Sequence, residues 1–268
     1  MNNIDGGGVN IYPIGTSTSF SGTFLGNGYT ISNVSINASS SSVGFFGYTY
    51  NATIQSLTLN ININQGSTTN NSIGGLIGYQ SGGTVSRVKV YSNITTNYDN
   101  VGGLVGVLDA GTITNSSTNG IINTGAQTTA AGGIVGSMLN NSTLEGSSSD
   151  SQLTVNIYTS SRVNTGYGGL VGVMGDGFVN KSYFTGKVSV NPYTQPYMVT
   201  ETAIGGIAGF EPGGTILNCY TASVIKDQNN YGTDFVGGIV GWLSNSNIYN
   251  SYSASSVSGG DSNGIGSN

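Results

Sequence analysis

The stretch Val101-Gly102-Gly103-Leu104-Val105-Gly106 decides the fold, because the chain repeats its pattern of an apolar residue, two glycines, two aliphatic residues and a glycine. Further copies begin at Ile73, Ala131, Tyr167, Ile204 and Val236. A degenerate copy, Val43-Gly44-Phe45-Phe46-Gly47, precedes them. The closing glycines of successive copies lie 28 to 37 residues apart. A recurring period of this length with variable insertions is typical of a solenoid.

The composition favours an ordered chain with little charge. Charged residues make up 6% of the sequence, against roughly 25% in a typical globular protein. Valine and isoleucine recur in register and the chain has 16 tyrosines, which argues against disorder. The net charge of −5 and the scattered basic residues argue against a nucleic-acid partner. The sequence lacks an apolar run long enough to span a membrane, and its first residues lack the pattern of a signal peptide.

A second segment of each repeat begins with a polar residue, mostly threonine, followed by an aliphatic one, as in Thr112-Ile113-Thr114-Asn115-Ser116. Aligning these segments places aliphatic residues in one column, namely Ile31, Ile54, Val85, Ile113, Leu144, Val179, Ile216 and Ile248. Three residues later stand small or apolar residues, namely Val34, Leu57, Val88, Ser116, Ser147, Ser182, Cys219 and Ser251. Two inward positions three apart on a strand require a bend between them. The intervening residues Asn33, Asn115, Gly146, Asn218 and Asn250 are of types that tolerate the left-handed backbone conformation.

With a third, valine-rich strand, each repeat offers three short strands. We therefore predict an all-β parallel β-helix (β-solenoid) of about eight coils with three short strands per coil. Residues 1–30 are expected to form an atypical N-terminal cap, and residues 31–268 a single continuous domain of β-helix repeats. The insertion at 192–201 is expected to be a corner loop. The tail at 263–266 resembles the start of a ninth coil, which favours a longer parent chain or head-to-tail stacking into a fibre.

The aliphatic pair in each glycine motif, such as Leu104 and Val105, poses a conflict. Both residues cannot face inward on a regular strand. We expect either an apolar outer stripe covered by a loop or neighbour, or a backbone bulge at this point.

These motifs together resemble the GLUG repeat, in which a Gly-Gly-aliphatic-aliphatic-Gly run precedes a Gly-Thr-Ile-x-Asn-(Ser/Cys)-Tyr run and a valine strand. The resemblance covers about residues 14–266. It implies a bacterial surface or secreted protein. GLUG repeats also occur in immunoglobulin A proteases, where they lie outside the catalytic domain. The family is defined by architecture, so the resemblance implies no particular activity.

Residues for catalysis or metal binding are scarce. The chain has no histidine, which excludes the Ser-His-Asp and Cys-His systems and the HExxH zinc site. The only cysteine, Cys219, occupies an inward column and is expected to be buried filler. Asp109, Asp176 and Glu211 stand in equivalent turns after the glycine motif and are expected to be solvated, although a paired-carboxylate glycosidase site is the alternative. We therefore predict no catalytic, metal or cofactor-binding residues and no cofactor.

Two outward columns remain as candidate contact surfaces. Tyr183, Tyr220 and Tyr252 follow the small inward column, and a stacked aromatic stripe there would bind sugar rings or a partner protein. Stabilising stacking between coils is the simpler interpretation. The second column consists of Thr30, Thr53, Thr84, Thr112, Thr143 and Thr215. An ice-binding face would need a second threonine two residues on, and only Thr112 has one, Thr114.

The sequence thus favours a non-enzymatic structural or adhesive β-solenoid that acts as a rigid stalk or fibre. We expect it to be extracellular or on the cell surface. It would present corner loops or the tyrosine stripe to a glycan or a host protein. The alternative is a carbohydrate-binding or carbohydrate-active β-helix module, and ice binding is a third hypothesis.

Overall fold

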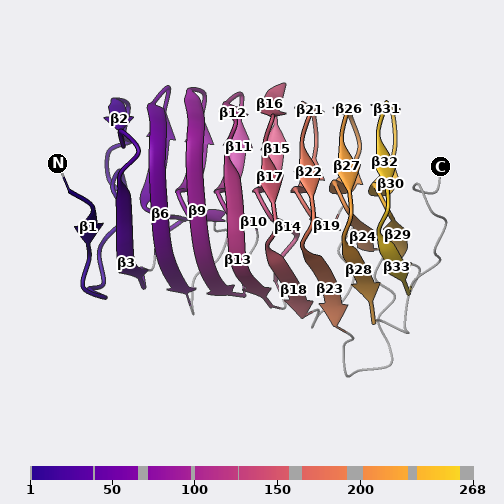
Figure 1. Ribbon diagram of the computed structural model, residues 1–268, viewed down its shortest axis with the longest axis horizontal. Coiled ribbons are helices and arrows are strands. Elements are labelled where there is room, and N and C mark those ends of the chain that lie inside the picture. Colours follow the sequence, from indigo (N-terminus) through magenta and orange to yellow (C-terminus); the bar gives the residue numbers. More distant parts are fainter. Residues whose placement is uncertain are drawn as a thin grey trace.

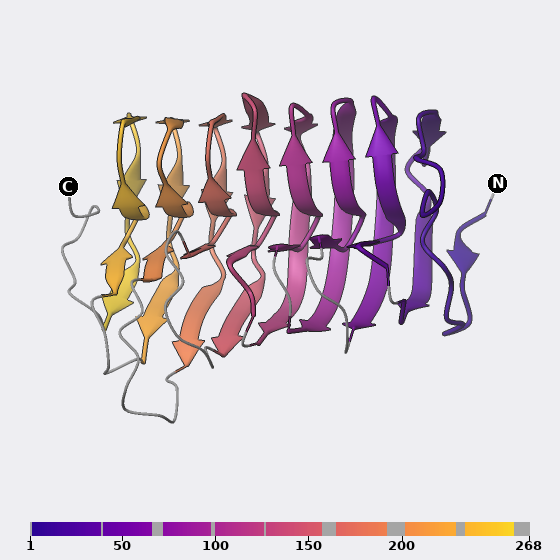
Figure 2. The ribbon, with the colours of Figure 1, turned by 180° about the vertical axis from the view of Figure 1, so that it is seen from behind.

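The computed structural model is an all-β structure in which the chain winds into a parallel β-solenoid (Figure 1). It describes residues 2–38, 40–65, 72–97, 100–125, 127–156, 165–191, 202–228 and 234–259. Successive coils lie side by side along the long axis, from the N-terminal end to the C-terminal end, and the view from behind shows the same order reversed (Figure 2). The predicted fold class is confirmed. No helix that could cross a membrane occurs among these residues.

Two short sheets each take one strand from every coil. The first short sheet contains β4 (Ser42–Val43), β7 (Ser72–Gly74), β10 (Asn100–Gly102), β14 (Ala130–Gly132), β19 (Thr165–Gly168), β24 (Thr202–Gly205) and β29 (Phe235–Gly237). The second short sheet contains β5 (Phe46–Tyr50), β8 (Ile77–Ser81), β11 (Val105–Asp109), β15 (Val135–Leu139), β20 (Val171–Met174), β25 (Ala208–Glu211) and β30 (Val240–Leu243). The described chain therefore has seven complete coils.

The third sheet, the large sheet, holds the remaining strands. Its N-terminal part consists of β1 (Ile4–Asp5), β2 (Thr23–Leu25), β3 (Thr30–Ile36), β6 (Thr53–Gln65) and β9 (Thr84–Thr96). Its middle part consists of β12 (Thr112–Thr114), β13 (Ser117–Thr124), β16 (Ser142–Glu145), β17 (Ser148–Ser149) and β18 (Gln152–Asn156). Its C-terminal part consists of β21 (Gly177–Asn180), β22 (Tyr183–Phe184), β23 (Lys187–Asn191), β26 (Gly214–Leu217), β27 (Tyr220–Thr221), β28 (Val224–Asp227), β31 (Ser246–Tyr249), β32 (Tyr252–Ser253) and β33 (Ser256–Ser258). Parallel pairing joins each rung to the next throughout.

The first rung of the large sheet differs from the expected alignment. Thr23, rather than Thr30, pairs with Thr53, while Thr30 pairs with Thr58. The register shifts once more between Ile31 and Val34. The reason is that this rung has extra residues at two points: the four residues between Leu25 and Thr30 lie opposite only two residues of β6, and Ser32 and Asn33 lie opposite Asn60 alone. The expected division at residue 30 therefore falls inside the first rung.

Aliphatic side chains stacked along the solenoid axis form its interior. Ile113 pairs with Leu144, which pairs with Val179, and all three are fully buried. The conflict within the glycine motif is resolved by a corner. Strand β10 ends at Gly102 and β11 begins at Val105, so the chain changes direction at Gly103 and Leu104, and both Leu104 and Val105 are buried. The expected external apolar stripe is absent from these described coils.

The large sheet bends at one residue in each rung, as the asparagine pattern predicts. Asn115, Gly146, Asn218 and Asn250 all have φ between 47° and 59°. Asn33 also has a positive φ of 54°, but it lies in the bulge opposite Asn60, so its predicted place in the bend column is wrong. The same left-handed conformation also occurs at Ser56, Arg87 and Lys181. The bend is therefore a property of the coil, adopted even where the residue type does not favour it.

Candidate contact surface

A buried polar ladder sets the position of the predicted tyrosine column. Ser182 Oγ accepts a hydrogen bond from the Ser147 amide at 3.1 Å and donates to the Asn180 carbonyl at 2.9 Å. Ser251 Oγ likewise accepts from the Cys219 amide at 3.0 Å. These bonds link the backbone just after each left-handed bend to the next coil. Because the hydroxyls point inward, the residue that follows each of them points outward.

Cys219 takes the place of a serine in this ladder. Its thiol donates to the Leu217 carbonyl at 3.2 Å and accepts from the Ser182 amide. The side chain is 1% exposed, and burial raises the pKa of the thiol. A buried thiol with a raised pKa is a poor nucleophile, which agrees with the expectation of structural filler.

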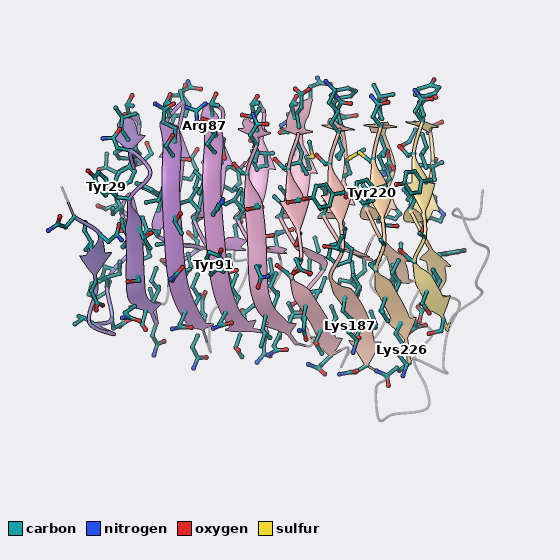
Figure 3. The ribbon with its side chains drawn as sticks, in the orientation of Figure 1. Tyr29, Arg87, Tyr91, Lys187, Tyr220 and Lys226 are labelled. Atoms are coloured by element: carbon teal, nitrogen blue, oxygen red, sulfur yellow. The ribbon has the colours of Figure 1, made fainter. Side chains whose placement is uncertain are left out.

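The three tyrosines form one continuous stack on the outer face of the large sheet. Tyr183 pairs with Tyr220, and Tyr220 pairs with Tyr252. The ring centroids are 4.9 Å and 5.6 Å apart, with interplanar angles of 6° and 11°. Tyr220 lies on the same face as Tyr91 (Figure 3). Burial within the stack, with the neighbouring phenols Tyr183 and Tyr252 as further causes, raises the pKa of Tyr220.

Two adjoining hollows lie on the N-terminal side of this stack. The first, of about 300 Å³, is lined by residues that include Tyr91, Asn119, Asp150 and Tyr183. The second, of about 390 Å³, shares Asn119, Asp150 and Thr185 with the first and extends to Lys187. We call the two hollows together the groove.

Sequence reasoning did not single out Tyr91, Asn119 or Asp150. The strand register places Tyr91 beside Asn119, and the Asn119 amide donates to an Asp150 carboxylate oxygen at 3.2 Å. All three residues stand two positions after the tyrosine column in their coils, and this shared position is the feature of the sequence that could have identified them. That signal is weak because alanine occupies the same position in later coils, at Ala222 and Ala254.

The expectation that Glu211 is a solvated turn residue is wrong. Glu211 is the last residue of β25 and its side chain is fully buried, with neither carboxylate oxygen hydrogen-bonded. Phe210 pairs with Val173 and Glu211 pairs with Leu243, so Glu211 follows Met174 in an inward column. Burial raises the pKa of its carboxyl group to about 8.

The other two acidic turn residues do not share the position of Glu211. Asp109 pairs with Leu139, one place beyond the inward column. Its carboxylate accepts hydrogen bonds from the Tyr79 hydroxyl at 2.8 Å and from the Asn140 amide at 2.6 Å. Asp176 is exposed in the following turn. The three residues therefore form no common carboxylate site, and the described residues contain no cluster of three or more His, Cys, Asp or Glu suited to a metal ion.

The threonine column differs from the predicted one at its first position, because Thr23 and not Thr30 pairs with Thr53. Thr53, Thr84, Thr112 and Thr143 stack in register, but Phe178 follows Thr143 and Asn247 follows Thr215. The corner loop expected at 192–201 and the ninth coil expected at 263–266 lie outside the described residues.

No protein-family model matches the chain, so the resemblance to the GLUG repeat remains a prediction. No curated protein matches it either. Among solved structures, an "IgA1 Protease" is similar over 89% of this chain, with a TM-score of 0.58 and 20% sequence identity. The matched region is 20% of that protein. At this identity the likeness shows the fold alone: the chain resembles a β-solenoid region of that protein.

Proposed function

We propose that this chain is a structural solenoid module that acts as a rigid spacer and displays the outer face of its large sheet. The observation that supports it best is the uninterrupted interior. From Val43 to Val240, each coil contributes buried aliphatic or aromatic side chains to one continuous core. One coil cannot order itself alone, because the conformational entropy lost by about 30 residues exceeds what a few buried side chains contribute. The coils therefore fold together and resist bending between them.

An extracellular or surface location fits this proposal. Serine, threonine, asparagine and glycine are abundant in the sequence, few residues are charged, and the similar structure is named as an IgA1 protease. The region of that protein that matches this chain is a fifth of its length. We place any enzymatic activity of a parent protein outside the described residues.

Two alternatives have less support. A glycosidase needs two carboxyl groups facing one substrate, and burial removes Glu211 from any surface site. An ice-binding face needs a regular double row of threonines, but Phe178 and Asn247 interrupt the single row. A display surface needs only the stacked tyrosines and the groove.

Spin labels at the two ends of the solenoid test its rigidity. Thr23 and Asn247 are exposed and occupy the same column, seven rungs apart, or about 34 Å at about 4.8 Å per rung. In a Cys219→Ser background, labelled Thr23→Cys/Asn247→Cys should give one narrow distance distribution by double electron–electron resonance. A broad distribution, or distances that change on dilution of the protein, would refute the rigid spacer.

A further inference from the structure

We propose that the groove beside the tyrosine stack is an oligosaccharide-binding subsite in which a sugar ring stacks on Tyr183. This inference deepens the proposed display function by naming the ligand class. Three observations support it: one face of the Tyr183 ring is uncovered, the neighbouring rungs leave room for a sugar ring, and Asn119 and Asp150 offer polar groups in the groove.

Tyr183 is the end of an aromatic stack. One face of its ring is covered by Tyr220 at 4.9 Å, nearly parallel. The opposite face is directed toward the preceding coil, where the paired residue is Ser148. Serine is too small to cover the ring, and Tyr183 is 37% exposed. The axial C–H face of a pyranose is flat, weakly positive and apolar, and it complements the negative face of a phenol ring.

The groove has room for such a ring. In the tyrosine column the two coils before Tyr183 carry Ser148 and Ser117, and the third carries Lys89. Two rungs therefore carry only serine between Tyr183 and Lys89, which are three rung spacings apart, or about 14 Å. The hollow there has a volume of about 300 Å³ and continues into the second one of about 390 Å³. Two connected hollows fit a chain of sugar units better than a single small molecule.

The polar groups in the groove suit hydroxyl recognition. Asn119 and Asp150 are hydrogen-bonded to each other at 3.2 Å, line both hollows and are exposed. A carboxylate accepts hydrogen bonds from two neighbouring hydroxyls, and a side-chain amide both donates and accepts. Asp150 is the only carboxylate among the residues that line the two hollows. A single carboxylate favours binding of a glycan over its hydrolysis, which uses two.

The test is binding of the intact chain to an array carrying N-acetylglucosamine oligomers, galactose-terminated oligosaccharides and sialylated oligosaccharides. The affinity for the best of these probes is then measured by titration calorimetry. Tyr183→Ala should weaken binding about tenfold, because it removes the stacking ring. The matched control is Tyr252→Ala at the other end of the stack, 61% exposed and outside the residues that line either hollow, which should bind as the wild type does.

A second variant keeps the proposal testable if Tyr183→Ala unfolds. Ser148→Tyr should extend the stack by one ring and fill the hollow, so that it abolishes binding while the melting temperature stays equal or rises. The proposal is overturned if no probe binds the wild-type chain, if Ser148→Tyr binds as well as wild type, or if Tyr252→Ala loses as much affinity as Tyr183→Ala. A narrow spin-label distance distribution alongside any of these results would leave the spacer function standing.

Discussion

Replacing Glu211 by methionine should stabilise the C-terminal coils near neutral pH. Glu211 lies in the interior without a hydrogen-bond partner, and Leu243 is its neighbour in the next coil. The preceding coils carry Met138 and Met174 in this column. Methionine thus continues an existing row of apolar side chains at little cost in packing.

The magnitude follows from the pKa. Burial raises the pKa of Glu211 from 4.5 to about 8, so at pH 7 the folded chain binds a proton that the unfolded chain has released. Below about pH 4.5 the carboxyl group is protonated in both states, and the free energy of unfolding is at its highest with respect to this group. It decreases as the pH rises, until Glu211 also ionises in the folded chain above about pH 8. At pH 7 the loss relative to acidic solution is roughly 3 kcal/mol. Glu211→Met should recover this amount, and in addition removes an unpaired buried polar group.

The only tryptophan of the chain provides the assay. Trp242 stacks on Phe210 at 4.5 Å, and Phe210 is adjacent to Glu211. Tryptophan fluorescence during urea denaturation therefore reports on these coils. The urea concentration at the wild-type unfolding midpoint should decrease as the pH is raised from about 5 to about 8. Glu211→Met and Glu211→Gln should lose most of this pH dependence. Asp176→Asn, at an exposed carboxyl group nearby, should keep it. Equal pH dependence in wild type and Glu211→Met, or a less stable Glu211→Met at pH 7, would refute the reasoning.

Three further pairs of substitutions test the coil geometry, each by thermal or urea denaturation. Cys219→Ser should change stability by less than about 1 kcal/mol because a hydroxyl continues the ladder, while Cys219→Val should cost about 1–3 kcal/mol by leaving the Ser182 amide unpaired. Asn115 has a φ of 49°, so Asn115→Gly should leave the free energy of unfolding nearly unchanged. Asn115→Val should lower it by about 1–2 kcal/mol, because a β-branched residue disfavours the left-handed conformation. Equal effects of the two substitutions would contradict the left-handed bend. Gly103→Ala should cost about 1–3 kcal/mol because its Cβ would collide with the Gly133 carbonyl oxygen, whereas Gly22→Ala, whose Cβ would meet only the Phe20 ring at 3.4 Å, should be tolerated.

Much of the solenoid could be predicted because each coil repeats the same side-chain columns. Ile113, Leu144 and Val179 share a column in the sequence and are buried in one column of the structure. The tyrosine stack was predictable for the same reason, since Tyr183, Tyr220 and Tyr252 each follow an inward small residue. Alignment failed where the repeat is irregular. The first rung has extra residues between Leu25 and Thr30 that shift its register. Glu211 ends a strand and lies in an inward column, whereas the alignment placed it in the turn that follows.

The sequence by itself determined the path of the coil and the inward and outward columns. Alternating burial and left-handed bends depend on local residue types, and the same residue types recur in each repeat. Only the tertiary structure decided what those columns do together. The groove exists because Ser148 and Tyr183, 35 residues apart in the chain, occupy neighbouring rungs, and the burial of Glu211 depends on the coil that follows it. Contacts between coils decide both features, and those contacts depend on register between distant residues.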